Sequence, residues 1–495
     1  MKYTVQDTTT MATVDNTGSG TCLCRICDSV RETVRQIFIV LDKYRWLLDA
    51  YIVDFYEADL WERLPGGWID FFKDITPGEL GSWILNEGSS VRVWPLSLQA
   101  LRRVVGILQV HRNQRSEIAL KCENVRKTEN TDFVKPQVKP STCSSHSKLR
   151  DLLGKHVKPK KKHEIEIMAK IIADCAASAK SECAVDVGAG IGHLARTLAY
   201  RHEMCIICVE QQSLLSEQAR KLDTQFESIA MKYVTNIREQ KPHHVSLKIE
   251  RDSSELSFFM DIINKEFTEK FRLNPEFSGF GLIGLHPCGD LATTLLQSYA
   301  ESDRAKFICV AGCCYMKLSL GPQSYPLSKY LRTTGIDYDL SYTALEVACH
   351  AVENHCIKLK SAECWELKIH AYRATLESLI VQRNSSLRHA QLKSFKLKEN
   401  TTFEEYCMAV TENFTEENRP RRVEEIRNPK TAELLERWEQ VVVFGSLRSM
   451  LAPLVESAVL LDRFLYLSEK NLSPKLKAVF DPFLSPRNFV LTSIK

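Results

Sequence analysis

Cys183-Ala-Val-Asp-Val-Gly-Ala-Gly-Ile-Gly-His193 is the stretch that decides the fold. Its apolar first half predicts a short buried strand, and apolar residues at helical spacing follow it at once. Gly188, Gly190 and Gly192 lie between the two, where a Cβ would block a close approach or forbid the turn. A strand, a glycine turn and a helix in this order bring a nucleotide-like ligand against bare backbone at a helix N-terminus.

The next apolar run supports the same interpretation. Residues 206–209 predict a second strand, which ends in Glu210. An acid at the tip of the second strand can accept both hydroxyls of a ribose. A glycine turn alone is a weak signal, but the turn together with the acid, the strand and the helix predicts a nucleoside-cofactor site.

The spacing of the glycines favours one cofactor over another. A dinucleotide-binding loop is written Gly-x-Gly-x-x-Gly, whereas this loop is Gly-x-Gly-x-Gly with an aspartate two residues before it. The pattern resembles motif I of class I methyltransferases, which bind S-adenosylmethionine. The resemblance implies that cofactor, and the residues predicted to contact it are Asp186, Gly188, Ala189, Gly190, Gly192, Glu210 and, near the adenine, Asp252.

The bulk composition indicates a globular protein of a reducing compartment. The 495 residues are enough for about two to four domains, and 44% of them are hydrophobic. A net charge of +4 neither demands nor excludes a nucleic-acid partner. The 17 cysteines are scattered and odd in number, unlike a secreted disulfide framework, so we expect an intracellular protein, cytoplasmic or nuclear.

No segment suggests a membrane partner. The N-terminus lacks the apolar region of a signal peptide. The longest apolar stretch, 441–467, is interrupted by four charged residues, whereas a spanning helix needs about 20 mostly apolar residues. We therefore expect a long buried helix there.

Strands and helices alternate after residue 184, which predicts a parallel sheet covered on both faces. A long helix at 445–468 and a terminal antiparallel hairpin follow, as in class I methyltransferase sheets and unlike nicotinamide dehydrogenases. The predicted fold class is α/β, a Rossmann-like class I methyltransferase fold with a mixed seven-stranded sheet. The expected strands are 184–187, 205–209, 244–249, 280–285, 307–311, 475–480 and 489–494, with further helices at 341–356 and 361–382.

Composition divides the chain further. Helical spacing marks the N-terminal part, linker composition follows it, and a polar, partly mobile insertion precedes the last helix. The predicted segments are disordered 1–20, a helical N-terminal domain 21–123, a linker 124–150, the methyltransferase core 151–384, the insertion 385–438 and the C-terminal part of the core 439–495.

Two clusters near the N-terminus carry alternative interpretations. Cys22-Leu-Cys24-Arg-Ile-Cys27 suggests zinc, but no second Cys or His cluster follows at finger spacing, so we expect free thiols and no metal. Five lysines lie within the eight residues Lys155–Lys162. They are either a solvated charge run or a patch that contacts phosphates, and on the second interpretation RNA is a partner.

A second constellation follows the fourth and fifth strands, and it supplies the candidates for catalysis. In an open parallel sheet, ligands bind beyond the carboxyl ends of the strands, and these two ends are expected to be neighbours. The chain has Leu285-His-Pro-Cys-Gly-Asp290 at one end and Gly312-Cys-Cys-Tyr315 at the other. The candidates are His286, Cys288, Asp290 and Cys314.

Four interpretations of these two strand ends, which we call the rim, remain open. His286 or Asp290 can orient or deprotonate an acceptor. Cys288 after the proline is similar to the thiolate nucleophile of pyrimidine C5 methyltransferases, which needs a lowered pKa. A soft metal site from the imidazole and the thiols is a third interpretation, and thiols that merely pack are the fourth.

Taken together, the motifs resemble the methyltransferase-like 25 family. They cover about residues 40–120, 150–380 and 440–495, and the nearest match is the B-type branch, once named for a ribosomal RNA adenine dimethylase domain. The resemblance implies a class I fold and use of S-adenosylmethionine. The motifs that carry it are Lys160-Lys-Lys-His-Glu164, Val185-Asp-Val-Gly-Ala-Gly-Ile-Gly-His-Leu194, Gly284-Leu-His-Pro-Cys-Gly-Asp-Leu291, Gly312-Cys-Cys-Tyr-Met-Lys317, Leu345-Glu-Val-Ala-Cys-His-Ala351, Ile369-His-Ala-Tyr-Arg-Ala-Thr-Leu-Glu377 and Phe480-Asp-Pro-Phe-Leu-Ser-Pro-Arg-Asn488.

Two further comparisons concern the acceptor. The His-Pro-Cys-Gly and Cys-Cys motifs are similar to those of transfer-RNA 2′-O-methyltransferases, which makes RNA the expected acceptor class and protein its rival. A catalytically inactive cofactor-binding scaffold is the alternative of a different class. Adenine N6 methyltransferases end the fourth strand in Asn/Asp-Pro-Pro-Tyr or Asn-Leu-Pro-Tyr, whereas this chain has His286-Pro-Cys-Gly289. It lacks both the amide or acid and the aromatic ring, so an adenine dimethylase activity does not carry over.

Overall fold

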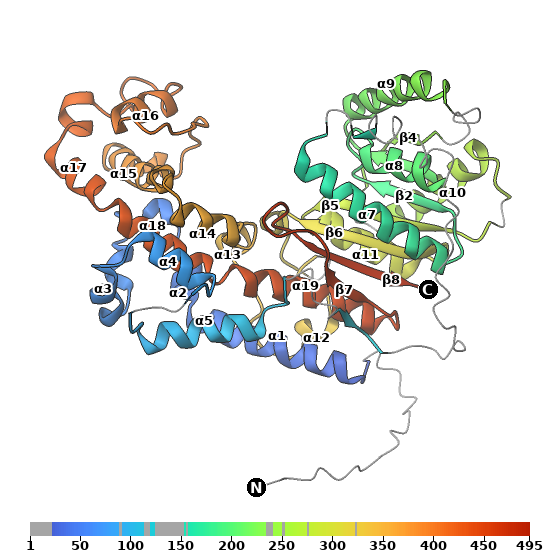
Figure 1. Ribbon diagram of the computed structural model, residues 1–495, viewed down its shortest axis with the longest axis horizontal. Coiled ribbons are helices and arrows are strands. Elements are labelled where there is room, and N and C mark those ends of the chain that lie inside the picture. The colour runs from blue at the N-terminus through green and yellow to red at the C-terminus, as the bar shows by residue number, and fades with distance from the viewer. Residues whose placement is uncertain are drawn as a thin grey trace, which may run out of the picture.

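The computed structural model of the protein describes residues 22–88, 92–112, 119–123, 153–154, 157–233, 241–249, 253–274, 277–321 and 324–495. An α/β body and a helical body lie side by side, and α19, Ala452–Glu469, runs between them (Figure 1). The predicted disordered segment 1–20 and linker 124–150 lie outside the described residues.

The α/β body is built on an eight-stranded sheet of order β1-β7-β8-β6-β5-β2-β3-β4. The strands from β6 to β4 in this order are parallel, whereas β8 is antiparallel to β6 and β7, and β7 is antiparallel to β1. This is the class I methyltransferase fold that the sequence predicted. The strands are β1 Leu120–Lys121, β2 Cys183–Val187, β3 Cys205–Glu210, β4 His243–Ser246, β5 Phe280–Cys288, β6 Ala305–Cys313, β7 Lys475–Ala478 and β8 Phe489–Ile494.

The expected number of strands was wrong by one. The extra strand is β1, in which Leu120 and Lys121 pair with Leu476 and Lys475 of β7. A two-residue strand carries too short an alternation to be recognised in the sequence, and its place at the sheet edge depends on a partner far along the chain.

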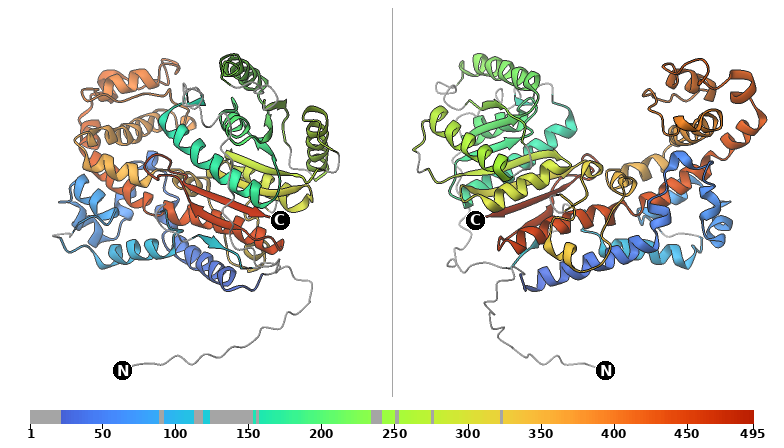
Figure 2. Two further views of the ribbon diagram at one scale, coloured as in Figure 1. Left: turned by 45° about the vertical axis from the view of Figure 1, so that its right-hand side comes forward. Right: turned by 180° about the vertical axis from the view of Figure 1, so that it is seen from behind.

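Helices cover both faces of the sheet because successive strand side chains point to opposite sides. On β2, Ala184 packs in the cluster with α7 and α8, and Val185 packs in the cluster with α10 and α11. The view from behind brings α10 and α11 to the front (Figure 2). The helices around the sheet are α7 Pro159–Ser178, α8 His193–His202, α9 Ser213–Ala230, α10 Ser253–Lys270 and α11 Asp290–Glu301.

The N-terminal helices share their core with the sheet. The apolar stripe of α1, including Val34, Phe38 and Leu41, is buried in the same cluster as Leu461 of α19 and Val185 of β2. A separate N-terminal domain was predicted at 21–123, but its described residues form one continuous core with the C-terminal helix. The elements are α1 Arg25–Lys43, α2 Arg45–Leu48, η1 Ile52–Asp54, η2 Leu60–Arg63, α3 Gly66–Phe72, α4 Pro77–Ile84 and α5 Leu96–Leu108.

The chain between β6 and β7 forms most of the remaining helical body. Its elements are η4 Tyr315–Lys317, α12 Lys329–Thr333, α13 Tyr342–Val347, α14 Val352–Lys360, η5 Cys364–Leu367, α15 Lys368–Arg383, η6 Ser385–Leu387, α16 Phe403–Val410, η7 Arg422–Ile426, α17 Pro429–Glu436, α18 Trp438–Ser449 and α19 Ala452–Glu469.

Three expectations for this region need correction. The predicted helix 341–356 is broken between α13 and α14, and the predicted helix 445–468 is broken between α18 and α19. Pro453 lies in the first turn of α19, and proline cannot continue a helix because it lacks the N–H and its ring clashes with the preceding turn. The insertion 385–438 is folded against α15, since Phe403, Tyr406 and Ile426 share a buried cluster with Leu376.

The buried helices do not resemble membrane spans. Nearly all residues of α19 are buried inside the protein, charged ones included. Among the described residues, no helix has both the length and the apolar character needed to cross a bilayer.

Candidate functional site

The glycine loop has the backbone that the sequence predicted. All three glycines adopt positive φ, with Gly190 at 58° and Gly192 at 74°. L side chains rarely adopt this conformation, so glycine is required there. A Cβ on Gly192 would lie 3.0 Å from the His244 ring, whereas a Cβ on Gly190 would meet nothing within 4 Å. The loop therefore packs against His244 at Gly192 and has open space beside Gly190.

A buried ion cluster supports the loop. Arg196 of α8 donates to the carbonyl of Ile191 in the loop and pairs with Asp223 of α9. Asp223 also contacts His244 of β4, with 2.6 Å between its Oδ2 and Nε2. All three side chains are buried. The sequence alone did not indicate this cluster, because its three residues come from α8, α9 and β4.

Glu210 lies against the loop, as expected for an acid at the end of the second strand. Its Oε2 accepts from the Gly190 amide at 3.0 Å, and its Oε1 accepts from the Gln212 amide at 3.1 Å. Each carboxylate oxygen has capacity for a further hydrogen bond. The predicted loop and acid are thus brought together, with acceptor positions left for a hydroxylated ligand.

The remaining residues predicted to contact the cofactor are Asp186, Ala189 and Asp252. Asp186 is buried at the end of β2, and this burial raises the pKa of its carboxyl to about 7, with Lys161 opposing the shift and Glu210 adding to it. The Ala189 amide donates to the Val209 carbonyl at 3.2 Å, so this residue joins the loop to β3. Asp252 lies outside the described residues.

The rim is also assembled as predicted, because β5 and β6 are neighbours and Cys288 is paired in register with Cys313. The Cys288 Sγ lies 3.4 Å from both the Cys313 and the Cys314 Sγ. Cys288 is exposed, Cys314 is half-buried and Cys313 is buried. Hydrogen bonds from Cys313 and, less strongly, Cys314 lower the pKa of Cys288 to about 5 despite partial burial, and Lys317 and His286 contribute. These interactions favour the thiolate form of Cys288 over that of its two neighbours.

His286 pairs with Glu164, which was not among the predicted site residues. Its Nε2 lies 2.9 Å from the Oε2 of Glu164 on α7, which is 1% exposed. Ser485 donates to the other oxygen at 2.6 Å. Burial alone would raise the pKa of Glu164, but the hydrogen bonds and charge of His286, Ser485 and Lys160 outweigh it and lower this pKa. Glu164 was visible in the sequence as an acid within the lysine-rich motif, but its partner is 122 residues away.

Asp290 has a different role from the other rim residues. Its carboxylate accepts from the Ser319 amide at 2.9 Å, from the Ser319 hydroxyl at 2.8 Å and from the Ser324 hydroxyl. These bonds tie the start of α11 to the loop after β6. The geometry therefore favours Asp290 as a residue that positions the two strand ends.

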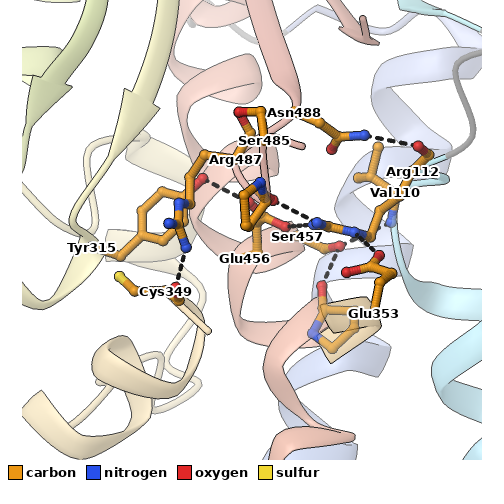
Figure 3. Close-up of polar contacts among 12 residues, drawn as sticks. Val110, Arg112, Tyr315, Cys349, Glu353, Glu456, Ser457, Ser485, Arg487 and Asn488 are labelled. Carbon is orange, nitrogen blue, oxygen red and sulfur yellow. Dashed lines mark hydrogen bonds and ion pairs between the residues drawn. The ribbon is translucent and has the colours of Figure 1, made fainter. Parts of the chain in front are cut away.

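A network of hydrogen bonds and ion pairs, mostly between buried side chains, connects Tyr315 to Arg112, Glu353 and Glu456 (Figure 3). The hydroxyl of Tyr315, next to Cys314, donates to Glu456 of α19 at 3.1 Å. Arg112 pairs with Glu456 and, at 2.7 Å, with Glu353. Tyr315, which follows the rim thiols of β6, is thus anchored through this network to the segment after α5, to α14 and to α19.

The lysine run borders the same edge of the sheet. Lys158, Lys160, Lys161 and Lys162 are exposed at the start of α7, and Lys155 lies outside the described residues. The Lys160 Nζ lies 3.9 Å from the Oε1 of Glu164, the partner of His286. The lysines therefore flank the rim.

The family described as "Methyltransferase domain" matches residues 160–320. This part of the chain is therefore similar to a methyltransferase domain. It contains the glycine loop, Glu210 and the rim. The proteins named "Probable methyltransferase-like protein 25" from Mus musculus and Homo sapiens are each 26% identical to the chain, over 229 and 246 residues. Each alignment covers 43% of this chain and 37% or 36% of the relative, so the chain spans a little over a third of those relatives' length. No solved structure matches significantly.

Proposed function

We propose that the protein is a methyltransferase that uses S-adenosylmethionine. The observation that carries the proposal is the contact between the Gly190 amide and Glu210 beside open space at Gly190. The loop admits the methionine part of the ligand, and the free acceptor positions of Glu210 bind the ribose hydroxyls. Bound S-adenosylmethionine supplies an activated methyl group for in-line displacement, so the main task of the protein is to hold donor and acceptor in line.

The rim acts on the acceptor in this proposal. A buried carboxylate on one nitrogen of an imidazole fixes the ring and leaves the other nitrogen to take a proton from an acceptor. Glu164 and His286 have this arrangement. A covalent role for Cys288 is a second candidate, favoured by its exposure and by its pKa of about 5. In that case the thiolate adds to C6 of a pyrimidine, C5 takes the methyl group as the S–CH₃ bond of the donor breaks, and loss of the C5 proton to a base such as His286 releases the thiolate.

RNA is the acceptor class that we propose. The exposed lysines at the start of α7 flank the Glu164–His286 pair, where they would meet the phosphates of a nucleotide held at the rim. We also infer from the motifs quoted above that the protein belongs with the B-type branch of the methyltransferase-like 25 family. A protein acceptor and an inactive scaffold are the alternatives.

Two measurements test the proposal. Isothermal titration with S-adenosylmethionine, with nicotinamide adenine dinucleotide as the control ligand, is expected to show binding of the first only. Absence of S-adenosylmethionine binding would refute the proposal. Tritiated methyl donor, incubated with the protein and a cellular extract, is expected to label the RNA fraction. Label in the protein fraction would favour the protein alternative, and binding without label in either fraction would favour the scaffold.

A further inference from the structure

We propose that Cys22, Cys24, Cys27 and Cys122 bind one structural zinc ion. The four Sγ atoms lie within 4.8 Å of one another. Cys122 lies 3.6 Å from Cys22, 3.9 Å from Cys24 and 3.6 Å from Cys27. Four sulfur ligands at about 2.3 Å around a tetrahedral zinc ion are separated by about 3.8 Å, so these distances match the edges of such a site.

The expectation of free thiols rested on the absence of a second cluster at finger spacing. The fold supplies the fourth thiol from much farther away, since Cys122 directly follows β1 and its amide donates to the Pro474 carbonyl at 3.0 Å. Pairing of β1 with β7 therefore places Cys122 over the start of α1, a position that the spacing of the cysteines could not reveal.

The backbone around the first three cysteines suits a metal-bound thiolate. Cys24 is the N-cap of α1, and its Sγ accepts from the Cys27 amide at 3.4 Å. Hydrogen bonds to ligand atoms orient them and offset their charge. Arg31 also donates to the Cys22 carbonyl at 2.8 Å and pairs with Asp28, which ties the segment of Cys22 to the first turns of α1.

Burial distinguishes a structural site from a catalytic one. Cys22, Cys27 and Cys122 are at most 5% exposed, and Cys24 is half-buried. Four sulfur ligands leave no open coordination position, as in structural zinc sites. The ion would join the start of α1 to the sheet edge, and because the site exists only in the folded chain, its binding energy would stabilise the fold.

A disulfide is the competing fate of close thiols. A disulfide bond needs about 2.05 Å between sulfurs, and these pairs are 3.6 to 3.9 Å apart. One disulfide would also leave the other two thiols unused. Zinc satisfies all four at once.

The test is the metal content of the full chain, purified without chelator from zinc-supplemented cells. We expect about one zinc per chain, with an X-ray absorption spectrum that shows four sulfurs at about 2.3 Å. Cys122→Ser should lose this zinc, and Cys24→Ser, at the least buried ligand, should lose it with less disturbance of packing. Cys364→Ser, a half-buried thiol of neither cluster, should keep it.

The thiols of the rim require a second control. Cys288→Ser should also keep the zinc, because the proposed ion does not contact the rim. No zinc in the wild-type chain, retention of zinc in Cys24→Ser and Cys122→Ser, loss of zinc in Cys288→Ser, or a disulfide within the cluster in mass spectrometry would each overturn the proposal. Should Cys122→Ser fail to fold, the absorption spectrum of the wild-type chain and the metal content of Cys24→Ser still decide it.

Discussion

The glycine loop and the rim lie at the ends of neighbouring strands but are built in different ways. The loop is local, since residues 186–212 contain every contact between its glycines and Glu210. The rim is assembled from α7, β5, β6 and the hairpin, and its partners are more than 100 residues apart at Glu164 and His286. A cofactor shared by many enzymes can be held by backbone, whereas an acceptor must be recognised by side chains that this fold alone brings together.

The largest effect is expected from a side chain in the loop. Gly190→Arg should reduce the affinity for S-adenosylmethionine by about 100-fold or more, a loss of about 2.8 kcal/mol. The arginine occupies the open space beside Gly190 and strains a residue with φ of 58°. Isothermal titration measures the change.

Gly335→Arg is the matched control, because Gly335 also has positive φ and open space but lies away from the site. It should strain the backbone similarly and bind the cofactor as the wild type does. Equal affinities of Gly190→Arg and wild type would show that the loop does not hold the cofactor.

A substitution in the rim should lower turnover and leave the affinity for the cofactor almost unchanged, the opposite of a substitution in the loop. Cys288→Ala is expected to lower turnover by about 100-fold, within the range for loss of a group that acts on the acceptor, and to leave the cofactor affinity within about twofold. Single-turnover transfer of labelled methyl measures the first and titration the second. Cys364→Ala serves as the control thiol, and full turnover by Cys288→Ala would exclude a thiolate nucleophile.

A smaller loss of turnover is expected when Glu164, the partner of His286, is changed. Glu164→Gln keeps the shape of the side chain but removes the charge that orients His286, so turnover should fall by about tenfold, or about 1.4 kcal/mol in the barrier. The KM for S-adenosylmethionine should not change, because Glu164 belongs to the rim. A rise in that KM with unchanged turnover would place Glu164 with the loop instead.

The last effect concerns Asp186 and appears in the free energy of unfolding, not in cofactor binding or turnover. Its pKa of about 7 in the folded chain exceeds the ordinary value of 3.8, so the folded state binds the proton more tightly than the unfolded state. The contribution of Asp186 to the free energy of unfolding is then greatest below about pH 4 and is lost as the pH rises through about 7.

Asp186→Asn removes this dependence. Without cofactor, its Tm relative to wild type should rise by a few degrees between pH 5 and pH 8, and Asp174→Asn, at an exposed position of α7, should show no such change. Parallel Tm curves for Asp186→Asn and wild type would contradict the raised pKa.

The sequence carried most of the sheet and the whole glycine loop, because these depend on local patterns. Val185 and its neighbours alternate between two faces, and Glu210 follows its strand directly. The sequence did not reveal the pairs of residues that only the tertiary structure brings together. Glu164 meets His286, Arg196 meets Asp223 under the loop, and Cys122 completes a cluster that begins at Cys22.

The break between α18 and α19 teaches a different lesson. The proline that marks it is present in the sequence, but mostly apolar residues lie on both sides of it, so the pattern indicated one helix. The folded insertion around Phe403 was hidden for the converse reason, since its polar composition masked a few apolar residues that pack on α15.

A single-turnover experiment distinguishes the two halves of the site in one measurement. Tritiated S-adenosylmethionine is bound to wild-type protein and to His286→Ala, and each complex is mixed with total RNA. We expect both proteins to bind the label, and only the wild type to transfer it to RNA at an appreciable rate. If the wild-type protein binds the label and RNA stays unlabelled, or if both proteins transfer it equally fast, the assignment of the cofactor to the loop and of the acceptor to the rim is wrong.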